Sequence, residues 1–122
     1  MRVLVCGGRD YSNSTELFSV LNEIHRVTPV DTIIHGGARG ADYLAGQWAK
    51  QYKGVSVVVV PADWGKYGKS AGPRRNFEMV NNCSPDLVVA VSGGRGTQDC
   101  VNHAEAAGLK VIKVQQREGM CI

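Results

Sequence analysis

Short apolar segments alternate along the chain with segments of helical periodicity, and this alternation constrains the fold more than any other feature. Between the apolar segments, hydrophobic residues recur every three or four positions, as on one face of a helix. Strands that alternate with helices through short connections form right-handed crossovers and a parallel sheet. The apolar runs that we expect to form strands are Arg2–Cys6, Thr32–His35, Val55–Val60, Leu87–Ala90 and Val111–Val114.

This pattern predicts an α/β protein with a three-layer Rossmann-like fold, in which a five-stranded parallel sheet carries helices on both faces. The expected strand order is 3-2-1-4-5, which puts a switch point between the first and fourth strands. The run Val55–Val60 is nearly all valine, which is typical of a strand covered on both faces. We expect Gly54 to end the second helix, and Pro73 to begin the third after a polar loop.

The chain of 122 residues is long enough for one core and too short for two. We expect one domain over residues 1–114 and a C-terminal tail over residues 115–122. The longest apolar run, Val57–Pro61, is too short to cross a bilayer, and no signal-peptide pattern follows Met1, so we expect a cytoplasmic protein without membrane contact. The four cysteines are scattered without metal-ligand spacing, and we predict no metal site and no cofactor.

Glycine is unusually common, with 15 residues in the chain. Many of the glycines fall in three loops of similar composition, each placed after a predicted strand and before a predicted helix. The carboxyl ends of parallel strands meet at one edge of the sheet, where open α/β folds bind their ligands. We therefore expect the three loops to line one crevice. They are Gly7-Gly8-Arg9-Asp10, Gly36-Gly37-Ala38-Arg39-Gly40-Ala41-Asp42 and Gly93-Gly94-Arg95-Gly96-Thr97.

The composition of this predicted edge favours an anionic ligand with at least one phosphate. Glycine lets backbone N–H groups approach a ligand, a helix N-terminus offers unpaired N–H groups, and arginine donates two parallel hydrogen bonds to phosphate. Half of the 14 lysines and arginines fall on this edge: Arg9, Arg39, Lys66, Lys69, Arg74, Arg75 and Arg95. Side chains that could bind a ribose or stack on a base are Asp10, Asp42, Asp63, Asp99, Tyr11, Trp64 and Tyr67.

Two other nucleotide-binding motifs are only partly present. Residues 68–70, Gly-Lys-Ser, are similar to the end of a Walker A loop, but Asp63 stands where that pattern needs its first glycine. Residues 94–96, Gly-Arg-Gly, begin a dinucleotide fingerprint, but Asp99 occupies the third glycine position. The sequence therefore favours neither P-loop ATP hydrolysis nor Rossmann-type NAD binding. The formal charge of +3 is too small to favour duplex nucleic acid.

Taken together, the loops resemble the YspA-type branch of the SLOG superfamily, whose relatives include the Lonely Guy phosphoribohydrolases and the Rossmann domain of DprA. The matching stretches span nearly the whole chain: residues 7–11, 35–42, 61–64, 67–69, 71–73, 75–76 with Met79, and 93–97 with Asp99. The resemblance implies a Rossmann-like fold and a nucleotide or nucleotide-derived ligand. The expected ligand-binding residues are Gly7, Gly8, Arg9, Asp10, Tyr11, Gly36, Gly37, Ala38, Arg39, Gly40, Asp42, Trp64, Lys69, Arg75, Asn76, Gly93, Gly94, Arg95, Gly96 and Thr97.

The resemblance also defines where a catalytic acid would lie. Lonely Guy enzymes remove a base from a nucleoside monophosphate with a Pro-Gly-Gly-x-Gly-Thr-x-x-Glu motif. In this chain Ser92 replaces the proline and Cys100 stands at the glutamate position. Asp99 is adjacent, but one residue is about 100° around a helix, so we expect its side chain to face elsewhere. The catalytic residue stays open, with Asp10, Asp42 and Asp99 as candidate carboxylates.

The leading hypothesis is a protein that binds an ADP-ribose-like or cyclic-nucleotide signal without converting it, as a sensor or a sequestering protein. In a phage this activity would serve as a sponge for a defence signal. One alternative is a nucleotide hydrolase that cleaves an N-glycosidic bond. A second is binding of single-stranded nucleic acid, by analogy with DprA. We also expect a homodimer or a larger homo-oligomer, because a small Rossmann domain often completes its crevice or covers an apolar helix by self-association.

Overall fold

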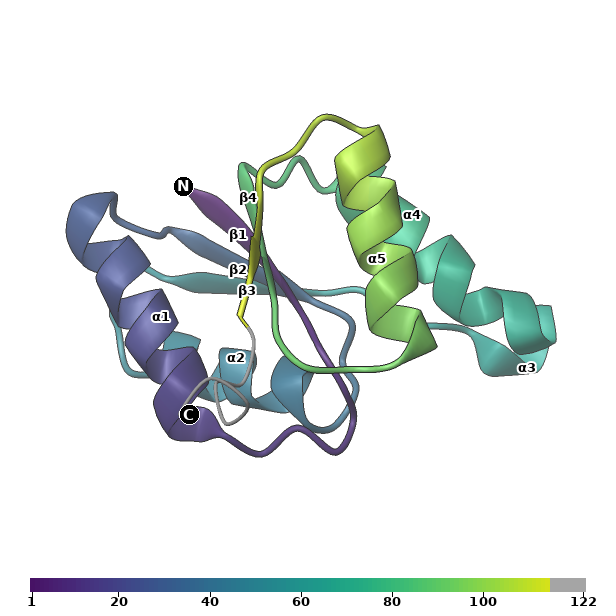
Figure 1. Cartoon of the computed structure of the whole chain (residues 1–122), viewed down its shortest axis with the longest axis horizontal. Helices are drawn as coiled ribbons and strands as arrows, with labels where there is room; N and C mark the ends of the chain where they lie inside the picture. The colour runs from purple at the N-terminus through teal and green to yellow at the C-terminus, as the bar shows by residue number, and fades with distance from the viewer. Residues whose placement is uncertain (115–122) are drawn as a thin grey trace, which may run out of the picture.

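The computed structural model describes residues 1–114 of the chain, and the predicted tail at residues 115–122 lies outside this range. Its strands form one parallel sheet in the order β3-β2-β1-β4-β5 (Figure 1). The predicted α/β class and strand order are therefore confirmed. The strands are β1 (Arg2–Cys6), β2 (Thr32–His35), β3 (Ser56–Val59), β4 (Leu87–Ala90) and β5 (Val111–Lys113).

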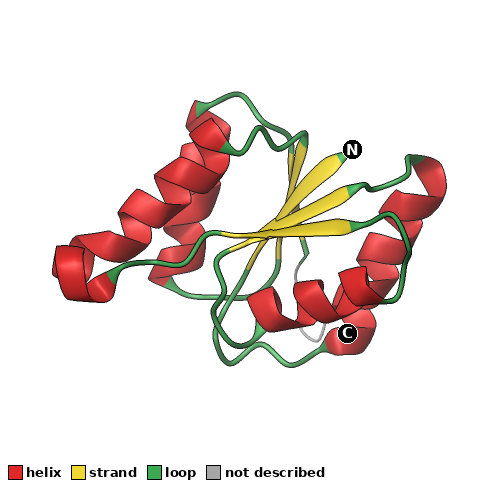
Figure 2. Ribbon diagram, turned by 180° about the vertical axis from the view of Figure 1, so that it is seen from behind, coloured by secondary structure: helices red, strands yellow, loops and turns green. Residues whose placement is uncertain are grey.

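Helices cover both faces of the sheet, as Figure 2 shows. On one face, α1 and α2 enclose a core that contains the fully buried Trp48. On the other face, α4 and α5 pack against each other and against a second core that contains Met79 and Cys100. The helices are α1 (Ser14–Val27), α2 (Ala41–Lys50), α3 (Trp64–Tyr67), α4 (Ala71–Asn82) and α5 (Arg95–Ala106), and a 3-10 turn, η1 (Gly68–Ser70), connects α3 to α4.

Three local predictions are corrected by the structure. Helix α2 ends at Lys50, and Gly54 instead takes a positive φ of 85° in the turn that leads into β3. Helix α4 begins at Ala71, with Pro73 inside its first turn, where the missing N–H costs no intrahelical hydrogen bond. The segment before it, predicted as a polar loop, contains α3 and η1.

Strand β3 is not covered on both faces, so that prediction is wrong. The strand order puts β3 at the edge of the sheet, and Val59 is 50% exposed. A run of valines is typical of any strand in a parallel sheet, and it does not distinguish a central strand from an edge strand. None of the helices in the described part of the chain combines the length and apolarity needed to cross a membrane.

Candidate functional site

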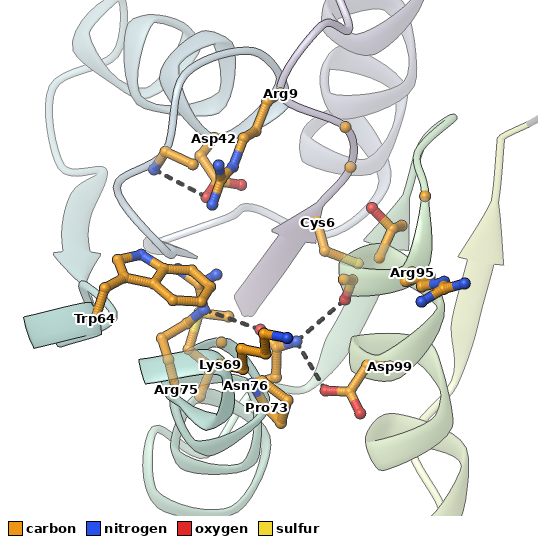
Figure 3. Close-up of a pocket in the computed structure, with 18 residues that line it drawn as sticks. Cys6, Arg9, Asp42, Trp64, Lys69, Pro73, Arg75, Asn76, Arg95 and Asp99 are labelled. Atoms are coloured by element: carbon orange, nitrogen blue, oxygen red, sulfur yellow. Dashed lines mark hydrogen bonds between the residues drawn. The ribbon is translucent and has the colours of Figure 1, made fainter. Parts of the chain in front are cut away.

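A cavity of about 630 Å³ opens at the carboxyl edge of the sheet, between the ends of β1 and β2 and the helices α4 and α5 (Figure 3). This volume is typical of a small-molecule site. Thirteen of the residues expected to bind a ligand line it: Gly7, Gly8, Arg9, Ala38, Asp42, Trp64, Lys69, Arg75, Asn76, Gly94, Arg95, Gly96 and Thr97. The other expected residues lie outside this lining: Asp10, Tyr11, Gly36, Gly37, Arg39, Gly40 and Gly93.

The start of α5 presents unpaired backbone donors to the cavity. Gly94 precedes the helix, and no side chain caps its first turn. No hydrogen bond within residues 1–114 uses the backbone N–H groups of Gly94, Arg95, Gly96 or Thr97. A methyl group added at Gly94 or Gly96 would meet no atom within 4 Å. These two glycines therefore leave open space beside a helix N-terminus, which is the arrangement that phosphate groups bind.

The loop that follows β2 is different, because its backbone donors are already used. The N–H groups of Gly36 and Ala38 donate to Asp42 Oδ2 at 3.1 and 3.2 Å, and that of Gly37 donates to His35 Nδ1 at 2.9 Å. The expectation that this loop offers N–H groups to a ligand is therefore wrong for these three residues. Ala38 still lines the cavity through its other atoms.

Two glycines of the first two loops, Gly8 and Gly40, pack their loops closely against a neighbouring loop. The Gly8 N–H donates to the Ser92 carbonyl at 2.9 Å, and a methyl group at Gly8 would lie 3.1 Å from Gly93 Cα. Gly40 has a positive φ of 79°, and a methyl group there would collide with the Gly8 carbonyl oxygen. Glycine at these positions is required by the close approach of two backbones rather than by a ligand.

A buried polar cluster supports the second loop. Asp42 is 7% exposed, and its burial raises the pKa of its carboxyl, although the Ala38 and Gly36 N–H groups, His35 and Arg75 act in the opposite direction. Burial lowers the pKa of His35, which is consistent with a neutral ring whose Nδ1 accepts a hydrogen bond. His35, at the end of β2, therefore makes a structural hydrogen bond with the loop that follows it. Arg75 Nη1 donates to the Gly36 carbonyl at 2.9 Å.

Asp99 lines the cavity, and the expectation that it faces elsewhere is wrong. Asn76 Nδ2 donates to Asp99 Oδ2 at 3.0 Å and to the Gly96 carbonyl at 3.1 Å. His103 Nε2 lies 3.4 Å from the same Asp99 oxygen. Cys100 is instead 1% exposed and belongs to the core under α5. The rotation of α5 about its axis therefore presents residue 99 to the cavity and turns residue 100 toward the sheet.

Cys6 lines the cavity floor, where its thiol is held in the protonated form. A hydrogen bond with the Cys100 thiol and the burial of the site both raise the pKa of Cys6 well above its ordinary value. A thiol with a raised pKa is a weak nucleophile. The Cys6–Cys100 pair therefore supplies packing rather than an activated sulfur at the position where the resemblance would place an acid.

Cationic side chains reach the cavity from four different segments. They are Arg9 after β1, Lys69 in η1, Arg75 in α4 and Arg95 at the start of α5. The Nε and Nη1 atoms of Arg75 are already bonded to Asn76 Oδ1 and the Gly36 carbonyl, both at 2.9 Å. No hydrogen bond or ion pair within residues 1–114 engages the charged groups of the other three. Lys69 and Arg95 can therefore approach an anion without losing a protein partner, whereas the Arg9 guanidinium lies over the Trp64 ring.

Three of the expected ligand contacts outside the cavity lining, Tyr11, Asp10 and Arg39, have protein partners of their own. The Tyr11 ring is buried in the core beneath α1 and α2, and its hydroxyl donates to Glu16 Oε1 at 2.6 Å, so the predicted stacking of Tyr11 on a base is wrong. Asp10 pairs on the surface with Arg39 Nη2 at 3.1 Å.

The cavity also contains four residues that were not expected to bind a ligand, although the last three belong to the stretches that carry the family resemblance: Cys6, Gly72, Pro73 and Met79. Glycine is favoured at position 72 for a structural reason, since a methyl group there would lie 3.1 Å from the Trp64 ring. Met79 lies on the buried face of α4, where its helical spacing indicates core packing only. No signal in the sequence separates its role in the cavity lining from its role in the core.

The comparisons with known proteins agree with this architecture. Residues 1–67 match the family described as "YspA, cpYpsA-related SLOG family". The chain belongs to this SLOG family. The predicted resemblance is therefore confirmed. This SLOG protein is also 40% identical over 118 residues to the "Gene 61 protein" of Mycobacterium phage D29, which covers 91% of this chain and 94% of that protein. No solved structure matches the chain. Membership of the family suggests a nucleotide-related ligand and specifies none.

Proposed function

We propose that this SLOG protein binds a nucleotide or nucleotide-derived ligand in the cavity at the carboxyl edge of its sheet. One observation carries the proposal: unpaired N–H groups of Gly94–Thr97 open into the same cavity as the side chains of Lys69 and Arg95. Backbone donors at a helix start and unengaged cations favour phosphate, and the volume of about 630 Å³ leaves room for a sugar and a base.

The ligand is captured rather than converted in this proposal. Cys100 occupies the position of the Lonely Guy glutamate and is buried in the core, so that position offers no acid to the cavity. Capture without conversion fits a sensor or a sequestering protein for an ADP-ribose-like or cyclic-nucleotide signal. In a phage, which is the source of the 40% identical relative, such a protein would act as a sponge for a defence signal.

A second candidate function is hydrolysis of an N-glycosidic bond, and the position of Asp99 favours it. Its carboxylate lines the cavity and is oriented by Asn76, which is itself buried. A single well-placed carboxylate can activate a water molecule or stabilise an oxocarbenium-like centre. The products expected from a nucleoside monophosphate are the free base and ribose 5-phosphate.

One experiment tests both candidates. The purified protein is incubated with nucleotides, ADP-ribose derivatives and cyclic dinucleotides, the mixture is ultrafiltered, and the retained fraction is denatured and identified by mass spectrometry. A compound depleted from the filtrate and recovered intact supports capture. Conversion to a base and ribose 5-phosphate, lost in Asp99→Asn, supports hydrolysis. If no compound in the panel is retained or converted, both proposals are contradicted.

A further inference from the structure

The two sides of the cavity differ in chemistry. On one side, the start of α5 and Arg95 provide donors for phosphate. On the opposite side, the side chains of Trp64 and Arg9 lie next to each other, as Figure 3 shows. Trp64 belongs to α3 and Arg9 to the loop after β1, so distant segments of the chain meet at this point. Asn76 and Asp99 lie between the two sides.

Trp64 is not held as a core residue. The other tryptophan, Trp48, is completely buried, and its indole N–H donates to Asn22 Oδ1 at 2.8 Å. Trp64 is 48% exposed, and its indole N–H makes no hydrogen bond within residues 1–114. The missing side chain at Gly72 lets the indole ring approach the first turn of α4. The ring is therefore positioned by packing on one side while much of its surface remains available in the cavity.

Arg9 is placed by Trp64 alone among the described residues. Its guanidinium carbon lies 5.6 Å from the centroid of the Trp64 ring, and no hydrogen bond or ion pair within residues 1–114 fixes it elsewhere. A planar base between the two groups needs about 3.5 Å on each side, or about 7 Å in all. Arg9 therefore has to withdraw by at least about 1.4 Å, which its long and otherwise unengaged side chain permits.

We infer that Trp64 and Arg9 form a clamp for the planar base of the ligand, and this inference rests on the function proposed above. The base stacks on the Trp64 ring beneath the Arg9 guanidinium, the ribose lies over Asn76 and Asp99, and the phosphate meets the start of α5. The ligand class is thus a nucleotide recognised by its base as well as by its phosphate, rather than a sugar phosphate or a polyphosphate. Stacking accepts every base, and the larger purine rings gain the larger contact.

The clamp is tested by comparing ligands with and without a base. AMP and ADP-ribose carry an adenine, whereas ribose 5-phosphate lacks it, and each is titrated by calorimetry into the wild type, Trp64→Leu and Trp64→Phe. We expect the wild type to bind an adenine compound at least tenfold more tightly than ribose 5-phosphate. Trp64→Leu should lose about tenfold in affinity for the adenine compound and bind ribose 5-phosphate unchanged, because only the adenine compound loses an aromatic stacking partner. Trp64→Phe should retain most of the affinity.

The outcomes separate this inference from the function on which it rests. If none of the three compounds binds the wild type, the proposed function itself is contradicted. If ribose 5-phosphate binds as tightly as the adenine compounds, or if Trp64→Leu weakens all three equally, phosphate binding stands and the clamp is wrong. Circular dichroism of each variant, together with the fluorescence of the buried Trp48, verifies that the fold is intact.

The role of Arg9 is tested with Arg9→Met, which keeps much of the length of the side chain and removes its charge. We expect several-fold weaker binding of AMP and unchanged binding of ribose 5-phosphate. Equal loss for both compounds would assign Arg9 to the phosphate and overturn its place in the clamp. AMP should also quench the emission of Trp64, and Trp64→Phe should abolish this quenching. Quenching that persists in Trp64→Phe would overturn the stacking on Trp64.

Discussion

The loops at Gly36–Gly40 and Gly93–Thr97 have similar compositions and follow the two strands that flank β1, yet their backbone donors are used differently. The difference originates at the second residue of the following helix. In α2 this residue is Asp42, whose carboxylate turns back and accepts two N–H groups of its own loop. In α5 it is Gly96, which has no side chain to do so. A glycine-rich loop is thus available to a ligand only if no nearby acceptor has already used its donors.

The largest expected effect is on stability, and it comes from replacing Asp42, which accepts the N–H groups of the Gly36–Gly40 loop. Asp42→Ala should lower the free energy of unfolding by about 3 kcal/mol, because it leaves the Gly36 and Ala38 N–H groups without partners in a mostly buried site. Asp42→Asn keeps an oxygen acceptor and should cost less. Urea denaturation measures both variants. The matched control, Asp99→Ala in the cavity, removes one acceptor of Asn76 Nδ2, which keeps its hydrogen bond to the Gly96 carbonyl, and should cost less than Asp42→Ala. Equal losses for Asp42→Ala and Asp99→Ala would remove the distinction between the loops.

Substitutions of glycine should also have different effects in the two loops. Gly40→Ala should cost about 2 kcal/mol or more, because Gly40 has a positive φ and its added methyl group would meet the Gly8 carbonyl. Gly96→Ala places a methyl group in open space within a helix and should stabilise the fold by up to about 1 kcal/mol. The same methyl group enters the cavity and should weaken AMP binding. Thermal denaturation and calorimetry report the two effects, and tight AMP binding by Gly96→Ala would contradict the assigned phosphate position.

Two arginines with the same loop context should differ in binding. Arg95→Ala should weaken AMP binding by about 1.5–3 kcal/mol, the range for a hydrogen bond to a charged group. Arg39→Ala should leave binding unchanged, because Arg39 pairs with Asp10 outside the cavity lining. Both variants should unfold within about 0.5 kcal/mol of the wild type. Calorimetry decides the comparison, and a larger binding loss in Arg39→Ala than in Arg95→Ala would reverse the roles of the loops.

The smallest expected effect is a pH dependence in the Gly36–Gly40 loop. Burial lowers the pKa of His35, so the unfolded chain binds more protons here than the folded chain below about pH 6.5, and stability falls as the pH falls through this window. The raised pKa of Asp42 has the opposite effect on stability. Its carboxyl stabilises the fold at low pH, and this stabilisation is lost as the pH rises through the folded-state pKa of Asp42.

The His35 contribution is therefore measured as a difference between variants. His35→Asn supplies a non-titrating oxygen to the Gly37 N–H, in the manner of an Asx turn. Urea denaturation at pH 7.5 and pH 5.5 should show a larger decrease on acidification for the wild type than for His35→Asn. An identical decrease in the two proteins would mean that His35 does not titrate as its burial indicates.

The arrangement of the sheet could be predicted from the sequence because it depends on patterns that are local. Each apolar run is bounded by glycine or polar residues, and the predicted strands agree with the structure to within one residue at each end. The predicted order is the one that a Rossmann-like fold has, with its switch point between the first and fourth strands. The exposure of Val59 was missed because neighbouring strands, not the valines themselves, determine which strand lies at an edge.

The candidate site was predicted less completely because its details depend on side-chain directions. The presence of Gly94, Arg95 and Gly96 in the cavity followed from their place after a strand. The orientations of Asp99 and Cys100 depend on the rotation of α5 against α4, which the spacing of a motif does not define. The use of the Gly36–Ala38 donors depends on where one carboxylate turns, a contact that composition alone does not reveal.

The most direct test of the contrast between the loops is amide hydrogen exchange measured by NMR, first on the protein alone and then with AMP. We expect the amides of Gly36, Gly37 and Ala38 to be protected without ligand and to change little when AMP is added. The amides of Gly94–Thr97 should exchange rapidly in the free protein and become protected with AMP. Rapid exchange at Gly36–Ala38 in the free protein, or AMP-dependent protection there and not at Gly94–Thr97, would contradict the contrast between the loops.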